Sequence, residues 1–267
     1  MKEGLVELSP TQVAGIRLIV AGLSLLPFVF KYLKQVKARD IFPLTIVALL
    51  GNGVPYYLFA YAETGMGSAL TGMLNSLVPM FTMLVALFVF KTKVGKLKIY
   101  GVIAGLIGAL VLIAAGGNIE GEFSYGLLVI VATICYGISV NTLKARLTHL
   151  SPLATAAIPL LITLVPAAIY IPIVEPIPFD NFDNQYVRSI GAIVTLGLVG
   201  TAIAMILFNR LIQLSSAIFA SSVTYLIPIV ALIWGIIDHE VINAWHFLGL
   251  SIILGAIYLI NKKERTI

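Results

Sequence analysis

Nine segments of this chain are long and apolar enough to cross a lipid bilayer, which takes about 20 mostly apolar residues per helix. Arg17 is the one charged residue that falls within any of them. None of the nine alternates polar and apolar residues as the strands of a membrane barrel do, so helices are expected. The sequence therefore predicts an all-α membrane protein with nine transmembrane helices, at residues 11–30, 41–62, 68–90, 99–117, 124–143, 152–174, 189–209, 216–237 and 244–261.

The composition excludes most other classes of protein. Only 11% of the residues are charged and the mean hydropathy is +1.04, whereas a soluble domain is about one-quarter charged. The single cysteine, Cys135, excludes an internal disulfide and a site made of several cysteines. No cofactor is expected.

Charge is distributed unequally between the loops on alternate sides. Fourteen Lys and Arg residues lie in one set of loops, whereas the other set holds Lys2, Arg188 and ten of the twelve carboxylates. Cytoplasmic loops are rich in Lys and Arg. The sequence thus predicts a multi-pass protein of the cytoplasmic membrane, with the C-terminus in the cytoplasm and Met1 outside. The same placement favours a lipid bilayer over nucleic acid as the partner of the basic residues.

The chain repeats itself, which is a frequent sign of duplicated architecture. Ser9-Pro10 begins a pattern that returns 142 residues later at Ser151-Pro152, and Pro79 returns 149 residues later at Pro228. Two copies of an odd number of helices must lie antiparallel in the membrane. Many transporters have this plan, with the substrate bound near mid-membrane where the copies meet.

The first copy is one helix shorter than the second, because nothing in it corresponds to 124–143. At an offset of 142 residues, Met1 falls on Leu143. We expect Met1 to be an internal methionine near the end of a missing first helix. A protein with nine helices by nature is the alternative.

Several diffuse motifs are shared with one known superfamily. They are Ser9-Pro10…Arg17, Ala69…Leu77-x-Pro79, Thr201…Asn209, Ser215…Ala220-Ser221…Tyr225-x2-Pro228 and Glu240…Gly249. On these residues the chain resembles the drug/metabolite transporter superfamily, in its EamA-domain branch. The resemblance implies a ten-helix parent fold of two inverted five-helix repeats around a central cavity, which moves small metabolites, often outward.

On this resemblance, residues 1–117 are the first EamA repeat without its first helix, 124–261 the second repeat, and 262–267 a cytoplasmic tail. The present chain is thus expected to have four helices in the first repeat and five in the second. One further departure is Lys91, which stands where the family usually has the glutamate found here as Glu240.

Arg17 is the strongest single indication of a site. An arginine inside a membrane span is costly and usually faces an aqueous cavity or a counter-charge. It lies eight residues beyond Ser9, about 12 Å along a helix, so its side chain could also extend to the membrane surface. Contact with a substrate or gate, and a structural anchor, are both open roles for Arg17.

Other polar residues lie within matched spans. Asn52 and Tyr56 share one helix face, and Thr201 corresponds to Asn52 in the second copy. Ser and Thr in membranes commonly bond to neighbouring helices, and we favour that role for Thr201. The predicted substrate-binding residues are Arg17, Asn52, Tyr56, Asn75, Tyr136, Asn141, Thr224 and Tyr225; hydrogen bonding between helices is the alternative role for the asparagines and tyrosines.

Pro79 and Pro228 lie near the middle of matched spans, where each proline frees a backbone carbonyl. They are predicted hinges or discontinuities beside the site, and fixed kinks are the alternative. Asp238-His239-Glu240 has metal-binding residue types, but adjacent residues rarely converge on one ion. We expect a solvated turn there.

The sequence contains no intramembrane enzyme signature and no Asp or Glu within a span, which argues against an enzyme and weakens proton coupling. We expect a carrier, an exporter by resemblance, for a small polar or amphipathic metabolite such as an amino acid. It would work by alternating access, with Arg17 meeting an anionic group. A non-transporting membrane subunit or an intramembrane enzyme is the rival class. A homodimer is compatible with the sequence.

Overall fold

The structure, a computed structural model, describes residues 1–92, 95–115, 119–177, 183–221, 223–224, 227–240 and 242–261. The regular elements within these ranges are all helical, which confirms the predicted all-α class. Six helices are long and apolar enough to cross a membrane: Pro10–Gln35, Ala38–Ala62, Ser68–Phe88, Phe123–Arg146, Pro152–Val174 and Asn184–Leu214. Three shorter apolar helices are Ile99–Ala114, Ile227–Ile237 and Ala244–Ile260. The count of nine transmembrane helices stays a prediction.

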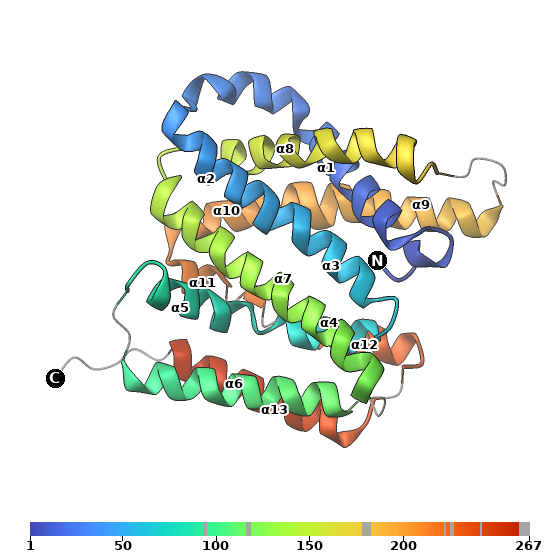
Figure 1. Ribbon diagram of the computed structural model, residues 1–267, viewed down its shortest axis with the longest axis vertical. Coiled ribbons are helices and arrows are strands. Elements are labelled where there is room, and N and C mark those ends of the chain that lie inside the picture. Colours follow the sequence, from blue (N-terminus) through green and yellow to red (C-terminus); the bar gives the residue numbers. More distant parts are fainter. Residues whose placement is uncertain are drawn as a thin grey trace. The chain divides into compact units, whose positions relative to one another are not determined.

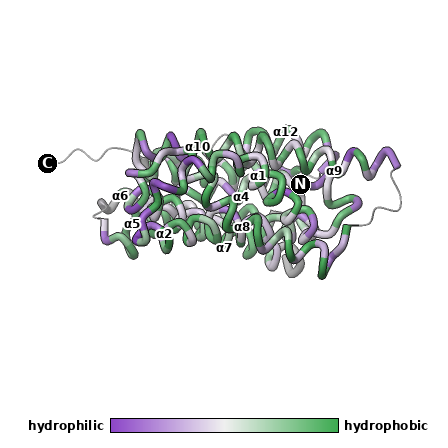
Figure 2. Tube along the Cα trace, turned by 90° about the horizontal axis from the view of Figure 1, so that it is seen from above, coloured by the Kyte–Doolittle hydropathy of each residue, from purple (hydrophilic) through white to green (hydrophobic). Residues whose placement is uncertain are grey.

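Apolar side chains cover much of the helix surface. Phe42, Ile173 and Leu214 are each more than 70% exposed, at 74%, 74% and 77%. Large apolar side chains are mostly buried in soluble proteins, whereas helices in lipid expose them. In Figure 2 most of the trace along the helices has the colour of hydrophobic residues, whereas the first turns of the helix that starts at Asn184 are hydrophilic.

The chain divides into two units, each made of two stretches of sequence. Unit 1 comprises Met1–Thr64 and Thr142–Ser215, and unit 2 comprises Gly65–Asn141 and Ser216–Ile267. Each unit thus contains parts of both sequence copies. The boundary at residue 141 falls inside one long helix, α7 (Ile119–Arg146).

Unit 1 is built from two matching sets of helices. The first set is η1 (Gly4–Val6), α1 (Pro10–Tyr32), η2 (Leu33–Gln35), α2 (Ala38–Ala48), η3 (Leu49–Gly53) and α3 (Val54–Ala62). The second set is α8 (Pro152–Val174), α9 (Asn184–Gly197), η4 (Leu198–Ile203) and α10 (Ala204–Leu214).

The two Ser-Pro motifs begin α1 and α8 in the same way. Ser9 caps α1 by accepting a bond from the Gln12 amide at 3.1 Å, and Ser151 caps α8 by accepting one from the Ala154 amide at 3.2 Å. Each proline occupies the first helical position, where a missing N–H does no harm. The repeated motif therefore has the same structural meaning in both copies.

Both of the next spans contain a π-helical turn. One is η3, between α2 and α3, and the other is η4, between α9 and α10. Their first residues, Leu49 and Leu198, are 149 residues apart, the offset that relates Pro79 to Pro228. The sequence analysis expected two continuous helices. A π-turn inserts one extra residue and often marks a functional site.

Helices α1 and α8 lie side by side and antiparallel (Figure 1). A β-carbon on Gly15 would lie 2.7 Å from Ile171, and one on Gly22 would lie 2.6 Å from Leu164. Glycine thus allows the two helices to approach closely. Helix α1 also contacts α3, α9 and η4, and α8 contacts their counterparts α10, α2 and η3.

Unit 2 contains the matched broken spans and the last helix of each copy. Its elements are α4 (Ser68–Asn75), α5 (Val78–Phe88), α6 (Lys96–Ala115), most of α7, α11 (Ala217–Ser221), α12 (Ile227–Ile237) and α13 (Ala244–Asn261). The expected helix over 68–90 is in fact two helices. Pro79 lies in the first turn of α5, where proline is tolerated. Pro228 is the second residue of α12.

In unit 2, too, a contact between two helices is matched by a contact between their counterparts in the other copy. Helix α4 contacts α12, and α11 contacts α5. Helices α6 and α13 run together (Figure 1). A β-carbon on Gly101 would lie 2.8 Å from the Ala256 carbonyl oxygen, and one on Gly249 would lie 3.0 Å from that of Gly108. Gly255, by contrast, has open space.

Candidate functional site

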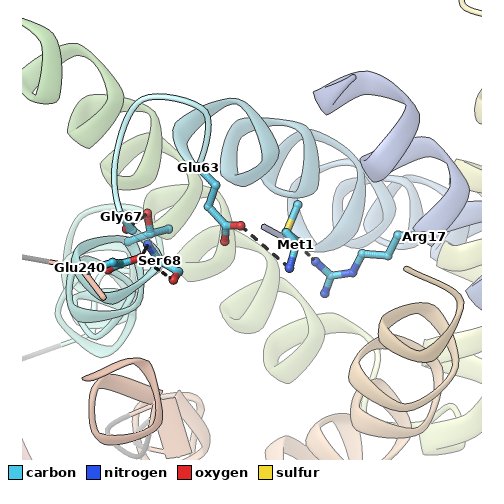
Figure 3. A network of polar contacts seen from close by, with 7 residues as sticks. Met1, Arg17, Glu63, Gly67, Ser68 and Glu240 are labelled. Atoms are coloured by element: carbon cyan, nitrogen blue, oxygen red, sulfur yellow. Dashed lines mark hydrogen bonds and ion pairs between the residues drawn. The ribbon is translucent and has the colours of Figure 1, made fainter. Parts of the chain in front are cut away.

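A polar cluster in unit 1 surrounds Arg17, about two turns after the start of α1. The Arg17 Nε donates a hydrogen bond to Thr201 Oγ1 of η4, over 2.7 Å. Its guanidinium lies over the Tyr56 ring of α3, 3.7 Å from the ring centroid. Its Nη1 donates to Met1 Sδ at 3.6 Å, as Figure 3 shows from close by. Arg17 thus joins one sequence copy to the other.

Tyr56 and Asn52 extend this cluster to the π-turn η3. The Tyr56 hydroxyl donates to Asn52 Oδ1 over 3.2 Å, one turn earlier in the chain. Asn52 is fully buried and Tyr56 is only 4% exposed. The structure therefore brings together three predicted site residues, Arg17, Asn52 and Tyr56.

Thr201 was assigned a helix-packing role from the sequence, and its contact with Arg17 was missed. The Thr201 hydroxyl donates to the Leu196 carbonyl at 3.1 Å, five residues earlier, near the end of α9. That bond leaves an oxygen lone pair for Arg17. The signal was present in the sequence, because Thr201 corresponds to Asn52, but a membrane threonine has many packing roles.

The cluster has no matching arginine in the second copy. At the offset that relates the Ser-Pro motifs, Arg17 corresponds to Pro159 of α8. The Asn52 Nδ2 is buried and has no hydrogen-bond partner among the described residues. A buried donor without a partner costs about 1–3 kcal/mol. Asn52 therefore retains capacity to donate to a bound group.

Glu63 lies at the end of α3, also in unit 1. One of its carboxylate oxygens is 3.9 Å from the Met1 amine, and Figure 3 shows the two groups directed toward each other. Glu63 is thus a titratable group at the end of a membrane-spanning helix. None of the carboxylates that the structure describes forms an ion pair with Arg17.

The other predicted binding residues lie in unit 2. The Asn141 amide donates to the carbonyls of Thr82 and Gly137, each over 2.8 Å, and so ties α7 to α5. The Thr224 hydroxyl donates to the Ser221 carbonyl, and Asn75 has a buried Oδ1 without a hydrogen-bond partner among the described residues. Tyr136 is half-buried on α7. Tyr225 lies outside the described residues. All five stay predictions as substrate contacts.

Asp238 and His239 form an exposed turn, as expected, but the Glu240 side chain is partly buried and bonded. Its Oε1 accepts bonds from the Ser68 amide and hydroxyl, both at 2.8 Å, and its Oε2 accepts one from the Ala69 amide at 3.0 Å (Figure 3). The carboxylate caps the start of α4, where the helix dipole favours negative charge. This partnership spans 172 residues, so local sequence could not reveal it.

A metal centre finds no support in the described part of the chain. No group of three or more His, Cys, Asp or Glu side chains there could hold an ion. The polar cluster around Arg17 offers hydrogen-bond donors and a cation, which suit the binding of a polar or anionic solute.

The chain is similar to known transporters over nearly its whole length. The family model described as the EamA-like transporter family matches residues 1–114 and 124–262. The uncharacterized inner membrane transporter YedA of Escherichia coli (strain K12) is 27% identical over 261 residues, which is 94% of this chain and 81% of YedA. The uncharacterized transporter YoaV of Bacillus subtilis (strain 168) is 25% identical over 268 residues, with 97% and 87% coverage.

One solved crystal structure shares the fold, with a TM-score of 0.65 at 15% identity; the match covers 95% of this chain and 88% of that one. The family model accounts for nearly the whole sequence in two segments, and the structure is all-helical where it is described. The helices have the length and apolar composition of a multi-pass membrane protein. The family model and the names of the relatives indicate a transporter rather than an enzyme. The chain belongs to the EamA-like transporter family.

Proposed function

We propose that this chain carries a small polar or amphipathic metabolite, such as an amino acid, outward across the cytoplasmic membrane by alternating access. One observation carries the proposal: Arg17 of the first copy bonds Thr201 of the second copy and lies over Tyr56 of its own copy, beside the π-turns η3 and η4. Interrupted helices beside a polar site are typical of transporters whose copies rock against each other. YedA is named an inner membrane transporter, which supports the proposed location of this chain in the cytoplasmic membrane.

The proposal includes two inverted repeats, 1–117 and 124–261. Support comes from the two family-model segments and from helix pairs that persist when the copies are exchanged. Gly22 contacts Leu164, its own counterpart 142 residues later, as expected if a two-fold axis passes between α1 and α8. Residues 262–267, the proposed cytoplasmic tail, lie outside the described residues. A homodimer stays a prediction.

The interruptions near Pro79 and Pro228, together with η3 and η4, are the proposed hinges. Each is a short segment that departs from the α-helix in both copies, so a change there can move one part of a span against the other. Asn52 and Thr201 lie within the π-turns, where such a motion alters the polar cluster directly.

Transport is tested with the purified chain in proteoliposomes loaded with radiolabelled metabolites. Loss of at least one solute faster than from protein-free liposomes is expected. No movement across a panel of amino acids and other small metabolites would count against transport by this chain.

Orientation is tested separately by labelling with a membrane-impermeant maleimide. Cys135 is buried and is the only cysteine, so a Cys135→Ser background permits single new cysteines. Lys34→Cys is expected to react from the cytoplasmic side and Glu7→Cys from the outside. Reaction of both from one side would overturn the proposed orientation.

A further inference from the structure

The guanidinium of Arg17 has more donor capacity than the protein uses. It has five N–H donors, of which Nε is bonded to Thr201 and Nη1 faces the Met1 thioether. A thioether is a weak acceptor. The guanidinium carbon lies 3.7 Å from the centroid of the Tyr56 ring, so the ring shields this side of the group. The end of the fork, formed by Nη1 and Nη2, is therefore without a strong acceptor in the described structure.

The positive charge of Arg17 is also uncompensated within the described part of the chain. Arg188 pairs with Glu3 at 3.0 Å and Arg39 lies 3.7 Å from Asp40, but no described carboxylate pairs with Arg17. A lone charge within a membrane span is expensive. Arg17 is half-buried rather than enclosed, so a group from outside the protein can reach it.

We infer that Arg17 binds a carboxylate of the transported solute, through Nη1 and Nη2; this inference rests on the proposed function. The planar fork matches the two oxygens of a carboxylate. Because Thr201 occupies Nε, the carboxylate meets the end of the fork rather than its side. The Met1 thioether is displaced from Nη1, since a charged oxygen is the stronger acceptor.

Charge balance selects a carboxylate over a phosphate. Arg17 is the only Lys or Arg in the nine apolar segments, so this part of the chain supplies one positive charge. A carboxylate group neutralises the guanidinium that it contacts, whereas a phosphate monoester, with about −1.5 to −2 charges at pH 7, leaves an excess of negative charge beside it. The substrate class is thus a solute with a single carboxylate at the Arg17 end.

The inference is tested with acid–amide pairs on the purified chain. The probes are leucine and leucinamide, phenylalanine and phenylalaninamide, glutamine and glutaminamide, short monocarboxylates, and inorganic phosphate. Flux from proteoliposomes and thermal stabilisation in detergent are both measured. With the wild-type chain, at least one acid is expected to be transported and bound about tenfold or more better than its amide, and phosphate is expected to have no effect.

Arg17→Gln is expected to remove the preference for acid over amide, and Arg17→Lys to retain part of it. Arg188→Gln, at an exposed arginine on α9, is the matched control and is expected to keep full selectivity. Monodisperse behaviour in size-exclusion chromatography checks that each variant is folded, and Arg17→Lys provides a second readout should Arg17→Gln fail to fold.

Equal flux of acids and amides through the wild-type chain would overturn the carboxylate site while leaving transport intact. A tenfold acid preference that survives in Arg17→Gln would do the same. Absence of flux for every probe would reject the proposed function and, with it, this inference.

Discussion

Arg17 and Glu240 are both charged groups in half-buried positions, yet their surroundings differ completely. Both oxygens of Glu240 accept bonds from Ser68 and Ala69 at the start of α4. Arg17 has a hydroxyl, a ring face and a thioether around it, and no described carboxylate. A charge whose bonding capacity is met by the protein stabilises the fold. A charge whose capacity is left open is available for a ligand.

The sharpest test of this contrast compares Arg17→Gln with Glu240→Gln in transport, per amount of folded protein. Arg17→Gln is expected to lower the flux of a carboxylate solute by about tenfold or more, since a hydrogen bond to a charged group contributes about 1.5–3 kcal/mol. Glu240→Gln is expected to transport at nearly the wild-type rate. Initial rates in proteoliposomes measure both. An equal loss of flux in the two variants would contradict the different roles given to Arg17 and Glu240.

Stability should show the reverse order. Glu240→Ala removes three hydrogen bonds at the start of α4 and is expected to lower the free energy of unfolding by about 2 kcal/mol. Glu240→Gln keeps an acceptor and should lose less. Arg17→Gln is expected to leave stability unchanged or raised, because it removes an uncompensated charge. Denaturant unfolding in detergent micelles is the measurement, and a larger loss for Arg17→Gln than for Glu240→Ala contradicts the prediction.

Gly67→Ala tests the Glu240 contact without touching the carboxylate. A β-carbon on Gly67 would lie 2.6 Å from Glu240 Oε2, so the side chain must move and its bonds weaken. We expect a loss of about 1 kcal/mol in unfolding free energy. Gly191→Ala, where a β-carbon meets nothing within 4 Å, is the control and should cause no loss. Gly67→Ala combined with Glu240→Ala should be less than additive.

The smallest effect is expected at Tyr56. Tyr56→Phe keeps the ring under the Arg17 guanidinium and loses only the bond to Asn52, so solute affinity should change less than about twofold. Tyr56→Leu removes the ring face, which contributes about 0.5–1 kcal/mol, and should weaken affinity about two- to fivefold. Ligand-dependent thermal shifts compare the two variants. An equal effect of both would show that the ring does not position Arg17.

The helical class and the starts of α1 and α8 followed from the sequence because hydrophobic length and Ser-Pro caps are local properties. Other ends differ, since the span expected at 189–209 is Asn184–Leu214 in the structure. Ser9 and Ser151 begin their helices as the repeated motif suggested. The π-turns at η3 and η4 were missed, since a one-residue insertion barely changes the apolar pattern. Their detection depends on the backbone bonds of the folded chain.

The site was predictable where a residue was unusual for its surroundings. Arg17 stood out as a charge in an apolar segment, and Asn52 and Tyr56 stood out by their one-turn spacing. Thr201 and Glu240 were assigned other roles because their partners, Arg17 and Ser68, are distant in sequence. The roles of Asn75, Tyr136, Asn141, Thr224 and Tyr225 stay predictions.

The proline at position 159, opposite Arg17 in the repeat alignment, has a consequence for directionality. A carrier whose halves were chemically identical would treat its two aqueous compartments alike. Here the guanidinium belongs to one half alone, so the inward-open and outward-open forms are chemically inequivalent. The proposed carrier should consequently half-saturate at different solute concentrations on its two sides, even without an ion gradient to drive it.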